Sequence, residues 1–157
     1  MYFKSEDSSI IPVVIDQEEV RLQFFIVDLN SDGTPVPPGD AYIMVYDITD
    51  RSSFNVMRNA LKYTNDIPTI VVGNKVDLVR KRSVSRKDGL LLSAQNKVKF
   101  VEISAALNER IDDLLAGCIR QIQLDRTGFR DMKKITGKWC LPRLFTKNKF
   151  NPENLAT

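Results

Sequence analysis

The stretch TIVVGNKVDL, from Thr69 to Leu78, carries the clearest information about the fold. Its first four residues are apolar or β-branched, which predicts a strand buried on both faces of a sheet. Gly73 then leads into Asn-Lys-Val-Asp, which predicts a polar loop at the carboxyl end of that strand. Open α/β sheets bind their ligands at this end of the strands.

Strand-like and helix-like segments alternate on both sides of this stretch. Two apolar runs around a polar turn predict a β-hairpin near the start of the sequence. The expected strands are Ile10–Ile15, Val20–Leu29, Ala41–Tyr46, Thr69–Val72 and Lys99–Ile103. The expected helices run from Asp50 or Ser52 to about Tyr63, from Ser83 or Ser85 to Gln95, and from Glu109 to about Arg126. This alternation predicts an α/β fold with a largely parallel sheet and helices on both faces.

The composition is that of one folded domain with a basic tail. Of 157 residues, 43% are hydrophobic and 27% are charged, which is enough to bury a core. Residues 1–126 hold 16 Lys and Arg against 18 Asp and Glu, whereas residues 127–157 hold 7 against 2. We therefore predict a domain over 1–126 and a tail over 127–157. The sequence has no histidine, and its two cysteines, Cys118 and Cys140, are expected to be free thiols.

The loop Asn74-Lys75-Val76-Asp77 has side chains that suit a guanine base. Guanine presents two adjacent N–H donors beside a carbonyl acceptor, and the carboxylate of Asp77 can accept from both donors. Adenine lacks this donor pair, so it would leave the carboxylate unpaired. Asn74 would brace the loop, and the aliphatic stem of Lys75 would lie along the purine face. The alternative is an ordinary polar loop between a strand and a helix, because the pattern is short.

A second loop favours the guanine interpretation. The sequence Glu-Ile-Ser-Ala-Ala, Glu102 to Ala106, lies at the end of the next expected strand, and its backbone N–H groups can donate to guanine O6. Two such loops, each at the end of its own strand, are far more specific than either alone. The predicted guanine-binding residues are Asn74, Lys75, Asp77, Ser104, Ala105 and Ala106.

Three stretches, Gly39–Phe54, Ile67–Arg80 and Phe100–Ile122, carry a family resemblance, and the segment Val13–Asp28 matches more loosely. They resemble Ras-like small GTPases, and more narrowly the RGK group (Rad, Gem, Rem and Kir). The resemblance implies a Ras-like P-loop NTPase fold that binds GTP or GDP with Mg²⁺ and has weak or absent intrinsic hydrolysis. It also implies regulation of voltage-gated calcium channels through their β subunit, calmodulin binding, and a cytoplasmic position at the inner face of the plasma membrane.

Candidate partner contacts come from two regions. By position in the family, Arg80 and Leu107 are candidates for contact with the channel β subunit. In the tail, candidates for binding calmodulin or an anionic membrane surface are Lys138, Trp139, Cys140, Leu141, Arg143, Leu144 and Phe145. A disordered extension is the alternative for this tail. No nucleic acid partner is expected, and no homo-oligomer is obvious.

The sequence also departs from the family pattern. It has no Gly-Lys-Ser/Thr phosphate loop, and the family's first strand, phosphate loop and first helix would precede Ile10. The family's Mg²⁺ ligands are absent with them, while Asp28 and Gly33 are a candidate remnant of switch II. We therefore expect weak or lost GTP binding, no catalytic residue and no metal ligand. The alternative is an active GTP-hydrolysing signalling protein whose phosphate loop is missing from this sequence.

A structural expectation follows from the absent strand. In the Ras-like strand order it would lie between Arg21–Asp28 and Ala41–Tyr46. These two strands should therefore either pair directly or leave apolar edges exposed.

Overall fold

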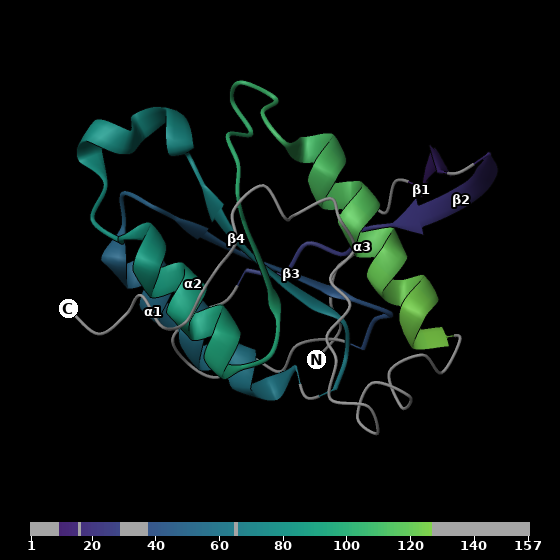
Figure 1. The fold of residues 1–157 in the computed structure, drawn as a ribbon, viewed down its shortest axis with the longest axis horizontal. Helices are drawn as coiled ribbons and strands as arrows, with labels where there is room; N and C mark the ends of the chain where they lie inside the picture. The colour runs from purple at the N-terminus through teal and green to yellow at the C-terminus, as the bar shows by residue number, and fades with distance from the viewer. Residues whose placement is uncertain (1–9, 16, 29–37, 65, 127–157) are drawn as a thin grey trace.

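A computed structural model of the chain describes residues 10–15, 17–28, 38–64 and 66–126. Its centre is a parallel sheet of three strands in the order β3–β4–β5 (Figure 1). The strands are β3 (Tyr42–Asp47), β4 (Thr69–Asn74) and β5 (Lys99–Glu102), and the helices are α1 (Arg51–Ala60), α2 (Arg86–Gln95) and α3 (Ile111–Arg126). Parallel neighbours require long crossover connections, and α1 and α2 provide them. The predicted α/β fold with a parallel sheet is confirmed.

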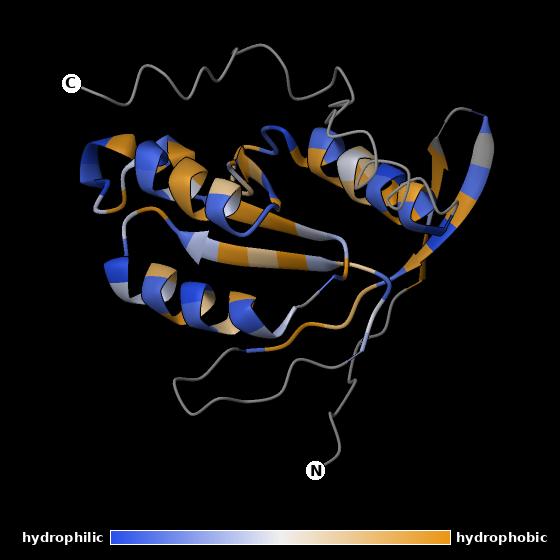
Figure 2. Cartoon of the chain, turned by 60° about the horizontal axis from the view of Figure 1, so that its bottom comes forward, coloured by the Kyte–Doolittle hydropathy of each residue, from blue (hydrophilic) through white to orange (hydrophobic). Residues whose placement is uncertain are grey.

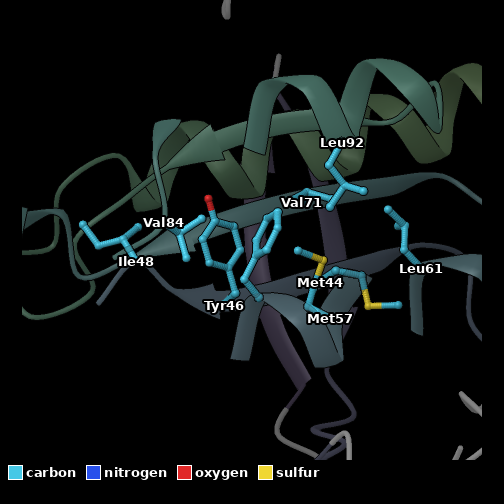
Figure 3. Close-up of a cluster of buried hydrophobic side chains, with 9 residues drawn as sticks. Met44, Tyr46, Ile48, Met57, Leu61, Val71, Val84 and Leu92 are labelled. Carbon is cyan, nitrogen blue, oxygen red and sulfur yellow. The ribbon is translucent and has the colours of Figure 1, made fainter. Parts of the chain in front are cut away.

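Helices cover both faces of this sheet. On one face α1 and α2 enclose a cluster in which Tyr46, Met57 and Val71 are almost completely buried (Figure 3). On the other face Leu114 and Cys118 of α3 pack against apolar side chains of β4 and β5. The strands are mostly apolar, whereas the helices alternate apolar and hydrophilic residues (Figure 2). This pattern is expected for a sheet that is buried on both faces.

Local capping explains where the first two helices begin. The carboxylate of Asp50 accepts hydrogen bonds from the N–H groups of Ser52 and Ser53, at 2.8 and 3.2 Å. The hydroxyl of Ser85 accepts from the N–H of Asp88 at 3.1 Å. Both residues are among the preferred N-caps, because their side chains satisfy N–H groups that a helix leaves open. Of the alternatives in the sequence, Asp50 and Ser85 are therefore the observed caps.

Two short 3₁₀ segments complete the central part. The segment η1 (Leu61–Tyr63) follows α1 directly, and η2 (Val76–Lys81) occupies the loop after β4. The sequence predicted only a loop at η2. None of the helices in the described ranges has the length and apolar character to cross a membrane.

The hairpin forms a separate sheet. Strand β1 (Ile10–Ile15) pairs with β2 (Glu18–Gln23) in antiparallel register. The predicted strand Val20–Leu29 is wrong over residues 24–28, which have no strand structure, and its last residue, Leu29, lies outside the described residues. A β-favouring sequence becomes a strand only where a neighbour supplies hydrogen bonds and packing.

The hairpin and the central sheet are not paired with each other. Within the described residues β3 is joined as a strand only to β4, so direct pairing between the two regions is wrong. The other expectation, exposed apolar edges, fits β3, where Val45 is 49% exposed; Ile26 is 97% exposed but lies outside any strand.

Candidate functional site

Two loops meet at the carboxyl ends of β4 and β5. The Val76 N–H donates to the carbonyl oxygen of Ile103 at 3.2 Å, and the Ile103 N–H donates to that of Gly73 at 2.9 Å. These backbone bonds continue the β4–β5 pairing beyond β5. The two sequence motifs are therefore held against each other by main-chain contacts.

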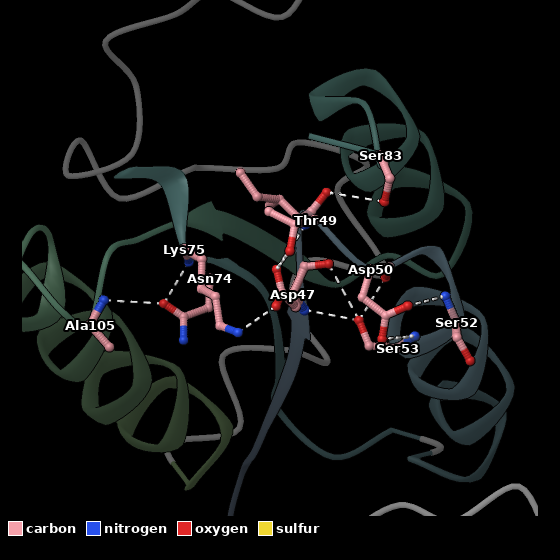
Figure 4. Close-up of polar contacts among 10 residues, drawn as sticks. Asp47, Thr49, Asp50, Ser52, Ser53, Asn74, Lys75, Ser83 and Ala105 are labelled. Atoms are coloured by element: carbon pink, nitrogen blue, oxygen red, sulfur yellow. Dashed lines mark hydrogen bonds and ion pairs between the residues drawn. The ribbon is translucent and has the colours of Figure 1, made fainter. Parts of the chain in front are cut away.

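Asn74 connects the two loops through its side chain. Its Oδ1 accepts hydrogen bonds from the N–H of Lys75 at 2.7 Å and from the N–H of Ala105 at 3.1 Å (Figure 4). An amide oxygen has two lone pairs, so both bonds are compatible. The structure therefore places Asn74 where it braces both loops.

Asp77 and Ser104 form the second connection. The Ser104 hydroxyl donates to Asp77 Oδ1 at 2.5 Å and accepts from the Leu107 N–H at 3.3 Å. Ser104 is completely buried, whereas Asp77 is exposed. A carboxylate offers about four acceptor positions, so this bond leaves Asp77 able to accept from a ligand. A rigid buried hydroxyl thus orients an accessible carboxylate.

The loop after β5 offers backbone donors beside that carboxylate. The Ser104 N–H donates to the Glu109 carbonyl oxygen at 3.3 Å, and the Ala105 N–H donates to Asn74 Oδ1. The Ala106 N–H makes no hydrogen bond in the described part of the chain. Ala105 and Ala106 are both exposed. An acceptor atom approaching this loop would therefore meet the Ala106 N–H as the available donor, because the Ala105 N–H already donates to Asn74 Oδ1.

Lys75 is held by a residue of a neighbouring strand. Its Nζ lies 2.6 Å from Asp47 Oδ2, and its backbone has the left-handed φ of 68°. Asp47 Oδ1 accepts from both the N–H and the hydroxyl of Thr49, each at 2.7 Å. Burial raises the pKa of the Asp47 carboxyl, but hydrogen bonds from Lys75 and Thr49 outweigh it, so that pKa lies below its ordinary value. The hydrogen bond to Asp47 likewise raises the pKa of Lys75.

The sequence interpretation did not include Asp47 in the site. The signal that could have identified it is the parallel register, because Asp47 ends β3 directly opposite Asn74, the last residue of β4. Residues opposite each other in neighbouring strands are close in space even when they are far apart in sequence. Predicting this contact therefore requires the strand pairing and its register.

An ion pair between Arg82 and Glu102 anchors the segment that follows the Asn74–Asp77 loop. The Arg82 guanidinium donates to both oxygens of Glu102, at 2.6 and 3.2 Å, and also to the Val84 carbonyl at 3.2 Å. The Glu102 side chain is only 9% exposed. Because Arg82 follows η2 and Glu102 ends β5, this pair fixes the segment that carries Asp77 to the sheet.

The other residues predicted for the site are either exposed or outside the described residues. Arg80 and Leu107 are exposed on the same two loops, with Leu107 at 67%. Asp28 is exposed, while Gly33 and the tail residues 138–145 lie outside the described residues. In the described ranges no three His, Cys, Asp or Glu residues are grouped so that they could hold a metal ion.

The fold and the two loops define a Ras-like α/β domain. The family model of the Ras family matches residues 34–124, more than half of the chain, so the chain belongs to the Ras family. Within it the chain is an RGK-type small GTPase, as its similarity to the GTP-binding proteins RAD, GEM and REM 2 indicates. The predicted recognition is therefore confirmed.

These relatives match the chain over different lengths. Human RAD is 38% identical over 125 residues, which cover 73% of this chain and 41% of the relative. Mouse GEM is 44% identical over 94 residues, which cover 56% of this chain and 32% of the relative. Rat REM 2 is 35% identical over 136 residues, which cover 78% of this chain and 39% of the relative. The chain thus spans less than half the length of the curated relatives it matches.

Proposed function

We propose that this chain binds guanine nucleotides through its base, with weak or no hydrolysis of GTP. The observation that carries the proposal is the connection between the two loops, through Asp77 to Ser104 and Asn74 to Ala105. Asp77 accepts from N1–H and the exocyclic amino group of guanine, while the N–H of Ala106 donates to O6 and Ala105 stays bound to Asn74. The relatives carry the words "GTP-binding protein" in their names, which supports the same ligand class.

Base contacts of this kind give selectivity more than affinity. Nucleoside triphosphates are held largely through their phosphates, by loop N–H groups, a lysine and Mg²⁺. The 157 residues contain no Gly-Lys-Ser/Thr sequence that would supply these groups. We therefore expect GMP and Mg-GTP to bind with similar, weak affinity. Tight binding of Mg-GTP with turnover would instead favour the alternative, an active GTP-hydrolysing signalling protein.

The test is a titration of the full chain with GMP and with AMP, followed by NMR. We expect GMP to bind at least about ten-fold more tightly than AMP, because AMP offers the Asp77 carboxylate no adjacent pair of N–H donors. The variant D77N should lose this preference. The matched control is D50N, which removes a nearby carboxylate but keeps a good helix cap. Equal affinities for GMP and AMP in the wild type would overturn the proposal.

We also propose that the chain regulates voltage-gated calcium channels by contact with their β subunit, as the RGK resemblance implies. Exposed apolar and basic side chains support this: Val79, which precedes Arg80 in the chain, and Leu107 of the loop after β5 are both more than half exposed. The Asp77–Ser104 hydrogen bond joins the loops that carry these side chains. Exposed apolar groups that lie together commonly mark protein contacts. The proposed setting is cytoplasmic, at the inner face of the plasma membrane, with calmodulin and anionic lipid as further partners of the tail.

A binding measurement with purified channel β subunit tests the contact. The double variant R80E/L107A should weaken binding by at least about ten-fold, since both charge and apolar area are lost. The control is R51E, which changes an exposed arginine on α1 by the same charge. Equal losses from the control and the double variant would show that net charge, and not this surface, governs binding.

A further inference from the structure

We propose that Asp47 is a positioning residue for the guanine base, acting through Lys75. The inference rests on the proposed base-binding function and adds a residue from a third strand to it. In this arrangement Asp47 holds the Lys75 ammonium at the end of β3. The aliphatic stem of Lys75 is thereby fixed as an apolar surface for one face of the purine.

The two oxygens of the Asp47 carboxylate have different partners. Oδ1 accepts both hydrogen bonds from Thr49, which fold the turn after β3. Oδ2 is the atom that faces Lys75 Nζ, at 2.6 Å. One oxygen therefore serves the local fold, and the other reaches into the loop that carries Asn74 and Asp77. Figure 4 shows the Lys75 side chain extending to Asp47 beside Asn74.

The stability of the fold does not account for the second contact. The Lys75 side chain is 50% exposed, and an ion pair at that exposure contributes little to stability. Holding a lysine in one geometry has an entropic cost. An aliphatic stem that is already ordered, however, can receive a flat ligand without paying that cost again on binding. The contact therefore makes physical sense as preorganisation for a ligand.

The backbone leads to the same conclusion. Lys75 has φ of 68° and ψ of 39°, a left-handed conformation that is unfavourable for residues with a Cβ. Its N–H is bound by Asn74 Oδ1, and its carbonyl accepts from the Leu78 N–H at 2.9 Å. With the backbone fixed at one end of the side chain and the ammonium at the other, the four methylene groups between them have little freedom.

A double-mutant cycle on GMP affinity tests the inference, using D47N, K75M and D47N/K75M in the full chain. Asn keeps an oxygen for Thr49 but places an amide toward Lys75, and Met keeps most of the stem without the charge. We expect D47N alone to weaken GMP binding about three- to ten-fold, the range for loss of one preordered side chain. In the K75M background, adding D47N should change the affinity less than two-fold.

Two controls separate positioning from general damage. D50N removes a carboxylate three residues away and should change GMP affinity less than two-fold. The NMR signal of the Lys75 ammonium, measured without nucleotide, should be observed in the wild type and lost through fast exchange in D47N. A signal unchanged by D47N would overturn the ion pair itself.

The binding outcomes distinguish this inference from the proposed function. Unchanged GMP affinity in D47N would overturn the positioning role while leaving the base site intact, and so would an equal loss in the K75M background. If the wild type does not prefer GMP to AMP, the proposed function fails, and this inference fails with it.

Discussion

Arg82 and Glu102 form a two-point ion pair that fastens the end of the η2 segment to the last residue of β5. The two distances are 2.6 and 3.2 Å, and both side chains are largely shielded from water. Arg86 approaches the same carboxylate from α2, at 3.7 Å. A single buried acid therefore organises the segment that follows the Asn74–Asp77 loop.

Removal of one member of this pair should destabilise the protein. We expect R82M to lower the free energy of unfolding by about 2–4 kcal/mol, because Glu102 is left buried and poorly compensated. The double variant R82M/E102L should lose less than R82M, since no charge is then buried. Urea denaturation measures both. A double variant less stable than R82M would show that the pair itself, and not the unpaired charge, dominates.

At Tyr46, in contrast to Arg82, a substitution is expected to keep or raise the stability of the protein. Its hydroxyl is buried and has no hydrogen-bond partner in the described structure, and burial raises its pKa. We expect Y46F to be as stable as the wild type or more stable by up to about 1 kcal/mol, because an unsatisfied buried polar group is unfavourable. A loss of more than about 1 kcal/mol in urea denaturation would mean that the hydroxyl has a partner in solution.

Gly89 allows α2 to approach the sheet closely. A Cβ at this position would lie 2.5 Å from a ring carbon of Phe100 and 2.8 Å from the Tyr46 hydroxyl. We expect G89A to lower the melting temperature, at a cost of about 1–3 kcal/mol from overpacking. Gly39 is the matched control, because a Cβ there meets its nearest atom at 3.6 Å. Similar losses in G89A and G39A would rule out the close approach as the cause.

Acid should weaken the contact between α1 and α2. A hydrogen bond from Arg51, at 2.6 Å, lowers the pKa of Asp88. A carboxyl whose pKa is depressed in the folded state stabilises above its unfolded pKa, about 3.9, and loses that contribution as pH falls below it. Both side chains are substantially exposed, so the contribution is below about 1 kcal/mol.

The measurement is unfolding free energy as a function of pH. Between pH 5 and pH 3 the wild type should lose more stability than D88N, in which the group no longer titrates. D112N is the control, as it removes a carboxylate of α3 far from Arg51 in sequence. If D88N and the wild type have parallel pH profiles, the depressed pKa is contradicted.

The central part of the fold could be predicted because its signals are local. Thr69–Val72 is apolar throughout and is followed at once by a polar loop, so strand and loop are both contained in a few residues. The same holds for Asp50 and Ser85, whose capping bonds reach only two or three residues along the chain. Such short-range preferences depend little on the rest of the molecule.

The parts that could not be predicted depend on distant neighbours. Residues 24–28 have a strand-like sequence but no strand partner in the described structure, so sequence pattern alone gave the wrong result. In the sequence Asp47 looks like an ordinary carboxylate at the end of a strand. Its closeness to the Asn74 loop becomes evident only from the register that places it opposite Asn74. In both cases the outcome was decided by pairing between strands, which single-sequence periodicity does not encode.

The left-handed backbone at Lys75 creates a trade-off between stability and activity at one position. Glycine would adopt this conformation without strain, so K75G is expected to relax the loop locally. The same substitution would remove the side chain that is proposed to cover the purine. Selection for a more stable protein and selection for a better base site should therefore favour different residues at position 75, and directed evolution for thermostability should be monitored there for loss of nucleotide binding.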